Sequence, residues 1–168
     1  MITATGSTRE SKIEQVETVL LDNYDRYYRL AYSYTHNEQD AGDIVQNGAY
    51  KAIRNAPLLK SREYCATWLY RIMLNEIFDF HRKRRDTAPL NEMPTERSEF
   101  DREDILDLRA AIDALPHEEK AIVLLRFFED CTLSEIADIM ELNLNTVKSR
   151  LYRCLEKLKL NLSSEEIS

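Results

Sequence analysis

Polar and cationic side chains recur with helical spacing in residues 143–159, and these side-chain types are the ones that bind nucleic acid. With about 100° between successive helical residues, one group of them falls within roughly 140° on one face. Its members are Asn145, Lys148, Ser149, Tyr152 and Arg153. Short polar side chains near a helix start suit base edges, and cations one or two turns later suit phosphates. Arg150 lies at the flank, where a phosphate contact is expected.

Two helices joined by a short polar turn are predicted to position this face. Thr132 followed by Glu135 matches a capping box, and the helix that it starts is expected to run to about Met140. Asn143 can cap the second helix, and the small Ala137 permits a close helix crossing. The apolar side of the second helix is predicted to be Val147, Leu151, Leu155 and Leu158. A helix-turn-helix and an ordinary amphipathic hairpin both agree with this stretch.

The overall charge argues against strong DNA binding by the chain alone. Its 168 residues carry a formal net charge of −7, which phosphates should repel. Two stretches are nevertheless basic, namely the run from His81 to Arg85 and the segment 146–159. We therefore expect weak unaided DNA binding, with specificity completed in a larger assembly.

Catalytic and metal sites are not indicated. Neither the cysteines nor the histidines show the paired spacing of a disulfide framework or a zinc site; they are Cys65, Cys131, Cys154, His36, His81 and His117. Asp40 and Asp43 form a DxxD pair, but a solvated or partner-facing surface is expected there rather than a metal. The sequence thus predicts no enzyme and no cofactor. The lack of any apolar run near the ~20 residues of a membrane span, or of a signal-peptide core, predicts a cytoplasmic protein.

The first part of the chain is predicted to be helical. Residues 1–10 are expected to be frayed, and a helical period runs from about Ser11 to Tyr34. Asn37 can cap a second helix with an acidic first turn, which suits the positive end of the helix dipole. The residues expected to face inward are Val16, Val19, Leu20, Tyr24, Tyr27, Tyr28, Ala31, Ala41, Ile44, Val45 and Ala52.

A third helical segment is predicted from near Ser61 to Arg85. Its buried stripe is expected to be Leu69, Ile72, Met73, Ile77 and Phe80. Its polar stripe is expected to be Arg71, Asn75, Asp79 and Arg82. Trp68 lies at the edge between the stripes. It can anchor the core or, beside Arg71 and the basic run, stack on exposed bases of single-stranded DNA.

Residues 86–104 interrupt the helical pattern with Pro89, Pro94 and many acidic side chains. We predict an acidic flexible linker here, between two domains. Helices are expected after it at 105–115 and 117–128. The second of them should bury Ile122, Val123, Leu125 and Phe128 or their neighbours. With only 3 Gly and 4 Pro in the chain, the sequence predicts an all-α fold of two small helical domains, the second containing a helix-turn-helix.

These motifs resemble the extracytoplasmic-function (ECF) group of the bacterial sigma-70 factors, which has regions 2 and 4 only. DAGDIVQNGAYKAI resembles the core-binding helix of the family, and TWLYRIMLNEIFDFHRKRR resembles its promoter-melting and −10-reading helix. The stretch from LPHEEK to CLEKLK resembles the −35-binding module. The resemblance implies a region 2 domain at 11–85, the linker at 86–104 and a region 4 domain at 105–162.

The resemblance also implies roles for individual residues. Core RNA polymerase would contact Asp40, Asp43, Ile44 and Gln46. The −10 element would meet Thr67, Trp68, Arg71 and Asn75, with phosphates on Arg82, Lys83, Arg84 and Arg85. The −35 element would contact Asn145, Thr146, Lys148, Ser149, Arg150, Tyr152 and Arg153. The chain departs from the family at Asn47-Gly48, where a helical glycine should cost up to about 1 kcal/mol relative to alanine.

The expected function is that of a sigma factor. Such a protein would bind core RNA polymerase, read the −35 duplex and capture melted −10 bases without covalent chemistry. An alternative is a helical adaptor or antagonist that binds polymerase without recognising a promoter. An anti-sigma protein, in this family often anchored in the membrane, is the expected regulatory partner by analogy.

Overall fold

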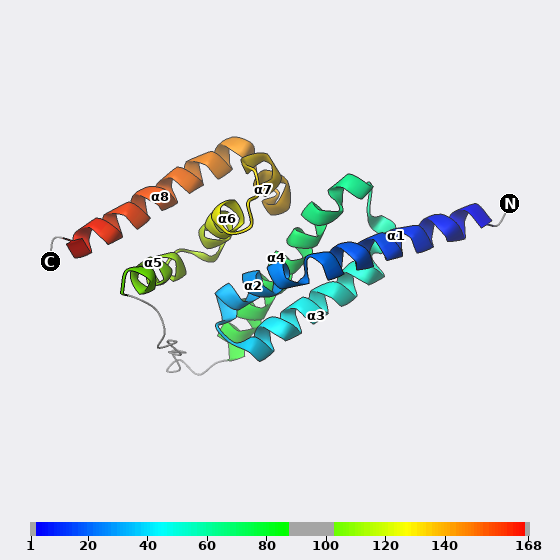
Figure 1. Ribbon diagram of the computed structural model, residues 1–168, viewed down its shortest axis with the longest axis horizontal. Helices are drawn as coiled ribbons and strands as arrows, with labels where there is room; N and C mark the ends of the chain where they lie inside the picture. The colour runs from blue at the N-terminus through cyan, green and yellow to red at the C-terminus, as the bar shows by residue number, and fades with distance from the viewer. Residues whose placement is uncertain (1–2, 88–102, 167–168) are drawn as a thin grey trace. The chain divides into compact units, whose positions relative to one another are not determined.

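The computed structural model describes residues 3–87 and 103–166, and all regular elements in these two ranges are helices (Figure 1). This result confirms the all-α prediction. The chain divides into two compact units, Met1–Pro89 and Leu90–Ser168.

The first unit contains α1 (Thr3–Asp22), α2 (Tyr24–Thr35), α3 (Glu38–Arg54) and α4 (Cys65–Thr87), with the short 3₁₀ helices η1 (Ala56–Leu58) and η2 (Arg62–Tyr64) between α3 and α4. The helix α3 packs against both α2 and α4, and α1 lies against η1, α3 and α4. The core includes side chains that are at most 2% exposed, among them Val16, Tyr27, Leu30, Ile44, Leu69, Met73 and Ile77.

The predicted helical period from Ser11 to Tyr34 belongs to two helices. The predicted fraying is wrong for residues 3–10, because α1 begins at Thr3, and residues 1–2 lie outside the described residues. The break falls at Asn23, where φ is −118° and ψ is 14°. The Asn23 side-chain amide donates to the Val19 carbonyl at 2.9 Å, which satisfies an acceptor at the end of α1. Tyr24 follows the break as the first residue of α2 and is 47% exposed, so its predicted burial is wrong.

The helix α4 begins at Cys65, after η2, and continues to Thr87. Ile72 and Phe80 are only partly buried, unlike the rest of the predicted stripe. The buried side of α4 is centred near Met73, which leaves Ile72 at its edge, while Phe80 lies beneath the Arg84 guanidinium. The predicted linker, 86–104, is helical at both ends, because α4 continues to Thr87 and α5 begins at Glu103. Residues 88–102 lie outside the described residues.

The second unit contains α5 (Glu103–Asp113), α6 (His117–Phe127), α7 (Leu133–Met140) and α8 (Leu144–Glu166). The helix α8 packs against the other three. Burial on α6 covers Ile122, Val123 and Leu125 as predicted, but Phe128 is 59% exposed. Phe128 is the C-cap residue of α6, and its backbone N–H donates to the Leu124 carbonyl at 2.9 Å. It therefore follows the last turn of the helix and does not share its buried side.

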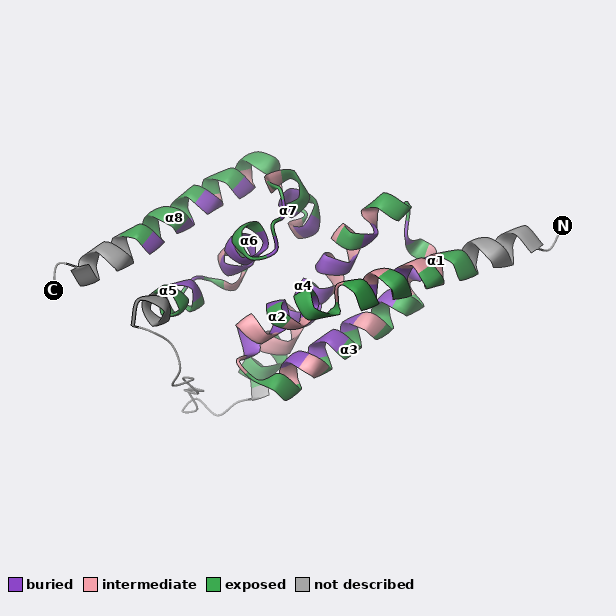
Figure 2. Ribbon diagram, viewed as in Figure 1, coloured by how far each residue is buried: buried purple, intermediate pink, exposed green. Residues whose placement is uncertain are grey.

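Up to Lys159, buried residues recur along one side of α8 (Figure 2). This buried stripe consists of Val147, Leu151, Cys154 and Leu158. The predicted inclusion of Leu155 is wrong, because Leu155 is 37% exposed and Cys154 takes its place. The observed spacing keeps all four residues within about 60° of one another, whereas Leu155 lies about 100° from Cys154.

Candidate nucleic-acid interface

The turn between α7 and α8 is fixed by side-chain caps at both helix starts. The Glu135 N–H donates to Thr132 Oγ1 at 3.1 Å, and the Thr132 N–H donates to Glu135 Oε2 at 2.8 Å, which confirms the predicted capping box. Asn143 Oδ1 accepts from the Asn145 N–H at 2.8 Å, as predicted. Between these caps, Glu141 adopts the left-handed conformation with φ of 56°, which ends α7 sharply. Two helices and a three-residue connection result, as in a helix-turn-helix.

The predicted reading face of α8 lies on the side opposite the buried stripe. Its exposed members are Asn145, Lys148, Ser149, Tyr152 and Arg153, and Thr146 is half-buried. Tyr152 is 65% exposed although it is a large aromatic residue. The Ser149 hydroxyl donates to the Asn145 carbonyl at 2.9 Å, so its oxygen remains able to accept a hydrogen bond. This surface offers donors, acceptors and an aromatic ring to a major groove.

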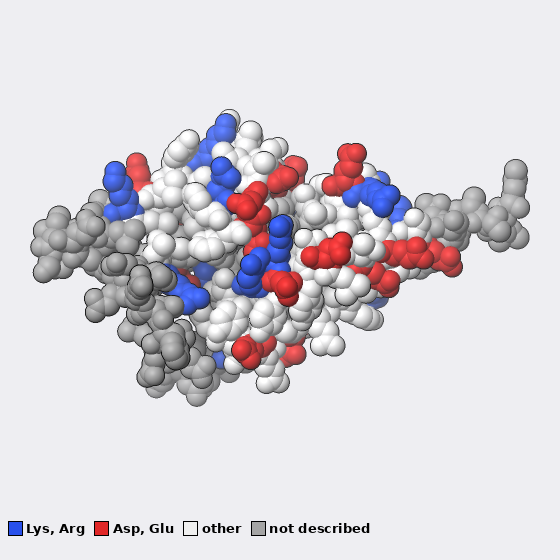
Figure 3. All heavy atoms as spheres, in the orientation of Figure 1, with Lys and Arg blue, Asp and Glu red and all other residues white. Residues whose placement is uncertain are grey.

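Acidic residues of α6 pair with cations on the flank of α8. Arg150 Nη1 lies 2.8 Å from Glu118 Oε2, and Lys157 Nζ lies 3.2 Å from Glu119 Oε2. In Figure 3 acidic and basic side chains are interspersed on the face that is shown. The ion pair of Arg150 with Glu118 thus connects α8 to α6 in this structure. A contact of Arg150 with a phosphate remains a prediction. Sequence reasoning missed these partners because 32 and 38 residues separate them along the chain.

The cysteines of the chain are buried free thiols. Burial, and after it the neighbouring Glu119 carboxylate, raises the pKa of the Cys154 thiol to about 11. Burial also raises the pKa of Cys65 above its ordinary value. Over the described residues, no group of histidine, cysteine and carboxylate side chains is arranged to hold a metal ion.

A second candidate face lies on α4. Thr67, Trp68, Arg71 and Asn75 fall within roughly 100° of one another, on the side away from the buried Met73. Asn75 is exposed, and the other three are half-buried. The Arg71 guanidinium lies 5.6 Å from the centroid of the Tyr64 ring, a distance at which a cation and an aromatic ring attract each other. The structure thus brings together the four residues predicted for the −10 element.

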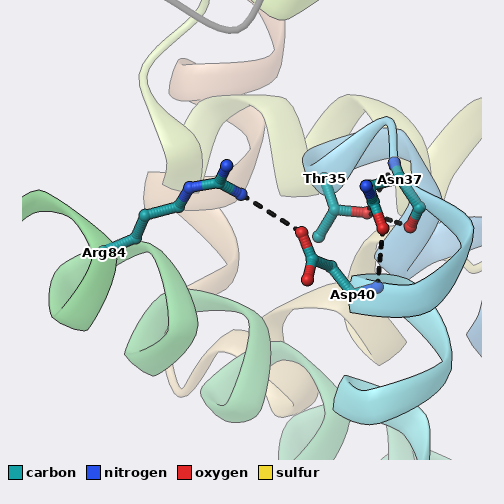
Figure 4. A network of polar contacts seen from close by, with 4 residues as sticks. All are labelled: Thr35, Asn37, Asp40 and Arg84. Carbon is teal, nitrogen blue, oxygen red and sulfur yellow. Dashed lines mark hydrogen bonds and ion pairs between the residues drawn. The ribbon is translucent and has the colours of Figure 1, made fainter. Parts of the chain in front are cut away.

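The lysine and arginine side chains of the basic run at the end of α4 are exposed, but they point in different directions. Arg82 and Arg85 share the side of Thr67 and Asn75, within about 80°. Arg82 forms an ion pair with Asp79 one turn earlier. Arg84 lies on the side facing α3, where its Nη1 donates to Asp40 Oδ2 at 3.2 Å (Figure 4). One member of the run therefore points to the predicted polymerase-binding helix.

The predicted polymerase-binding residues lie along α3. Asp43 and Gln46 are exposed and Asp40 is half-buried. Ile44 is 2% exposed, so it supports this face from the core and presents no side-chain surface to a partner. Asn37 Oδ1 accepts from the Asp40 N–H at 2.9 Å, which confirms the predicted cap of α3.

Two sigma-70 family models match successive parts of the chain. A family model described as Sigma-70 region 2 matches residues 20–87, and one described as Sigma-70, region 4 matches residues 105–158. The RNA polymerase sigma factor SigV of Bacillus subtilis (strain 168) is 39% identical over 154 residues, which are 90% of this chain and 93% of that protein. The ECF RNA polymerase sigma factor RpoE of Cereibacter sphaeroides is 33% identical over 133 residues, covering 75% of this chain and 72% of that protein.

A solved structure shows the same fold at lower identity. It is the sigma factor RpoE in complex with the anti-sigma factor NepR from Bartonella quintana, with a TM-score of 0.71 and 22% identity. The match covers 88% of this chain and 96% of that one. Fold, helix-turn-helix and matched regions together define a two-region transcription initiation factor. The chain belongs to the ECF group of the sigma-70 family, as the resemblance in its sequence predicts. In the described part of the chain, no helix has the length and apolar character required to cross a bilayer.

Proposed function

We propose that this sigma factor binds core RNA polymerase through the exposed residues of α3, captures melted −10 bases on α4 and reads the −35 duplex with α8. The observation that carries the proposal is the placement of the predicted contact residues. On α4 the four residues predicted for the −10 element share one face, and on α8 the exposed members of the reading face share another. Each face lies opposite the buried stripe of its helix. Side chains placed in this way are available to a partner without any loss of core packing.

The proposed −35 contact is made by the start of α8 in the major groove. Asn145, Lys148 and Ser149 lie in its first two turns, where recognition helices contact base edges. Tyr152 and Arg153 follow one turn later and can reach bases or phosphates. The caps at Thr132 and Asn143 would hold the two helices at a fixed angle, so that phosphate contacts set the register of the base contacts.

The proposed −10 contact needs no covalent chemistry, and we infer that the protein is not an enzyme. Unpairing bases costs a few kcal/mol, which stacking and hydrogen bonds to the released bases can offset. Trp68 and Arg71 offer an aromatic surface and a guanidinium for stacking, and Asn75 offers an amide that can donate and accept. Binding energy would thus drive strand separation within the holoenzyme.

The proposed location is the cytoplasm, where a polymerase-binding factor acts. The structural relative is a sigma factor in complex with an anti-sigma factor. We infer that an anti-sigma protein also controls this chain, by covering the surfaces proposed for polymerase and DNA.

Transcription with purified components tests the proposal. Promoters would first be selected from a random DNA library with core polymerase and this protein, and run-off transcription would then be measured with and without the protein. A transcript of defined start that requires the protein is expected. An adaptor or antagonist that does not recognise promoters would bind core polymerase and start no specific transcript, and this result would reject the proposal.

A further inference from the structure

We propose that Arg84 is a positioning residue of the polymerase-binding face and not a phosphate contact, although it lies within the basic run. In this role its guanidinium would fix the Asp40 carboxylate in the orientation that polymerase binds. The inference rests on the proposed function, because it takes the exposed residues of α3 as the polymerase-binding surface.

The helical phase of α4 separates Arg84 from its neighbours. Taking Thr67 as zero, Arg82 and Arg85 lie near 60° and 0°, on the side proposed to meet DNA. Arg84 lies near 260°, between the directions of Met73 and Ile77, which are both 0% exposed and face the core of the unit. Arg84 is thus directed toward α3 by its position in the helix.

The contact between the two helices is specific. Arg84 Nη1 donates to Asp40 Oδ2 at 3.2 Å, and the Arg84 guanidinium also lies over the Phe80 ring, 5.8 Å from its centroid. The side chain of Asp40 is 27% exposed and that of Arg84 is 51% exposed. The ring and the carboxylate together orient the guanidinium, while part of Asp40 remains accessible to a partner.

Hydrogen bonds also hold the backbone at Asp40 (Figure 4). The Asp40 N–H donates to Asn37 Oδ1 at 2.9 Å. The Thr35 hydroxyl donates to the Asn37 carbonyl at 3.2 Å, and the Asn37 N–H donates to Thr35 Oγ1 at 3.4 Å. Asp40 is therefore fixed through its backbone by the turn before α3 and through its side chain by Arg84.

Two neighbours provide matched comparisons. Asp43 lies one turn further along α3, and Arg85 is the next residue of the basic run. Both are exposed, and neither has an ion-pair partner among the residues that the structure describes. Ordering a side chain on binding costs affinity, so a carboxylate that is already ordered should bind polymerase about three- to tenfold more tightly than a mobile one. The structure records the Arg84 contact for Asp40 and none for Asp43.

The test measures the affinity of the full chain for core polymerase by titration. Arg84→Gln should weaken binding about three- to tenfold, and Arg84→Lys, which keeps the charge, should restore part of the loss. Asp40→Asn should weaken binding as well, and adding Arg84→Gln to it should cost little more, because the pair is already broken. In Asp43→Asn, by contrast, Arg84→Gln should retain its full effect.

The second readout is the salt dependence of promoter binding by the reconstituted holoenzyme. Arg85→Gln should lower the slope of log K against log salt by about 1, whereas Arg84→Gln should leave the slope as it is. Thermal unfolding of each variant shows whether it is folded. If Arg84→Gln does not fold, Arg84→Lys provides a second variant for the same measurements.

Two results would overturn the inference alone. One is a wild-type core affinity in Arg84→Gln, whatever its salt slope, and the other is tighter core binding in Arg84→Gln. If the wild-type chain did not bind core polymerase at all, the proposed function would be overturned together with the inference.

Discussion

Gly48 of α3 lies directly against Met73 of α4. An ideal Cβ atom at residue 48 would be 2.5 Å from Met73 Sδ and 3.1 Å from Met73 Cε, closer than side chains pack. Met73 is 0% exposed, so its thioether would have to shift within the packed core to make room for this atom. The sequence marks Gly48 only as a cost to the helix, whereas the structure shows that its missing side chain permits the close packing of α3 on α4.

Replacing this glycine should therefore destabilise the first unit. Gly48→Ala forces a buried side chain to shift, and we expect a net loss of up to about 2 kcal/mol after the gain of about 1 kcal/mol in helix propensity is subtracted. Gly42 in the same helix is the matched control, because a Cβ atom there meets nothing within 4 Å. Gly42→Ala should be neutral or stabilise by up to about 1 kcal/mol. Urea unfolding measures both, and equal effects of the two variants would contradict the packing argument.

Thr132 should stabilise the helix-turn-helix through its capping box. Thr132→Ala removes the acceptor of the Glu135 N–H, and we expect a loss of about 1 kcal/mol in the free energy of unfolding. Thr132→Ser keeps a hydroxyl at the same position and should recover most of this loss. If the alanine and serine variants unfold at the same urea concentration, the cap does not contribute.

Cys154 should make the second unit less stable at alkaline pH. Its pKa is about 11 in the folded chain and 9.0 as the ordinary value. Between these values the unfolded thiol loses its proton first, so stability that is present below pH 9 falls as the pH rises toward 11. The full loss would be about 3 kcal/mol at most.

Urea unfolding at several pH values from 8 to 11 tests this expectation with Cys154→Ala as the reference. The difference in unfolding free energy between the wild type and this variant should shrink as the pH rises. A difference that stays constant over this range would show that the thiol is not protected in the folded chain.

The sequence is sufficient to predict the caps and most of the buried stripes. The partners of Thr132 and Asn37 lie three residues away, so local spacing specifies both contacts. Periodicity fails where a helix begins or ends, as at Tyr24 and Phe128, because it does not indicate where the chain leaves the helical path. Periodicity also predicts Leu155 in the buried stripe of α8, because this hydrophobic residue is next to Cys154, which takes the buried position.

Contacts between helices could not be predicted in the same way. Arg84 and Asp40 are 44 residues apart, and Arg150 and Glu118 are 32 apart. Each pair depends on how two helices pack, which no local pattern specifies. The sequence therefore places Arg84 in a basic run, and only the structure shows that it is directed to α3.

The most direct test of the proposed function is run-off transcription by the holoenzyme on a selected promoter, with an intact or a scrambled −35 element. Arg153→Ala is compared with the wild type, because Arg153 is exposed on the proposed reading face. The wild type should transcribe the intact template far better than the scrambled one. The variant should lose much of this preference, about five- to a hundredfold for one lost base or phosphate contact, while its affinity for core polymerase stays unchanged. If Arg153→Ala transcribes the intact promoter as strongly and as selectively as the wild type, the assignment of this face to the −35 element is wrong.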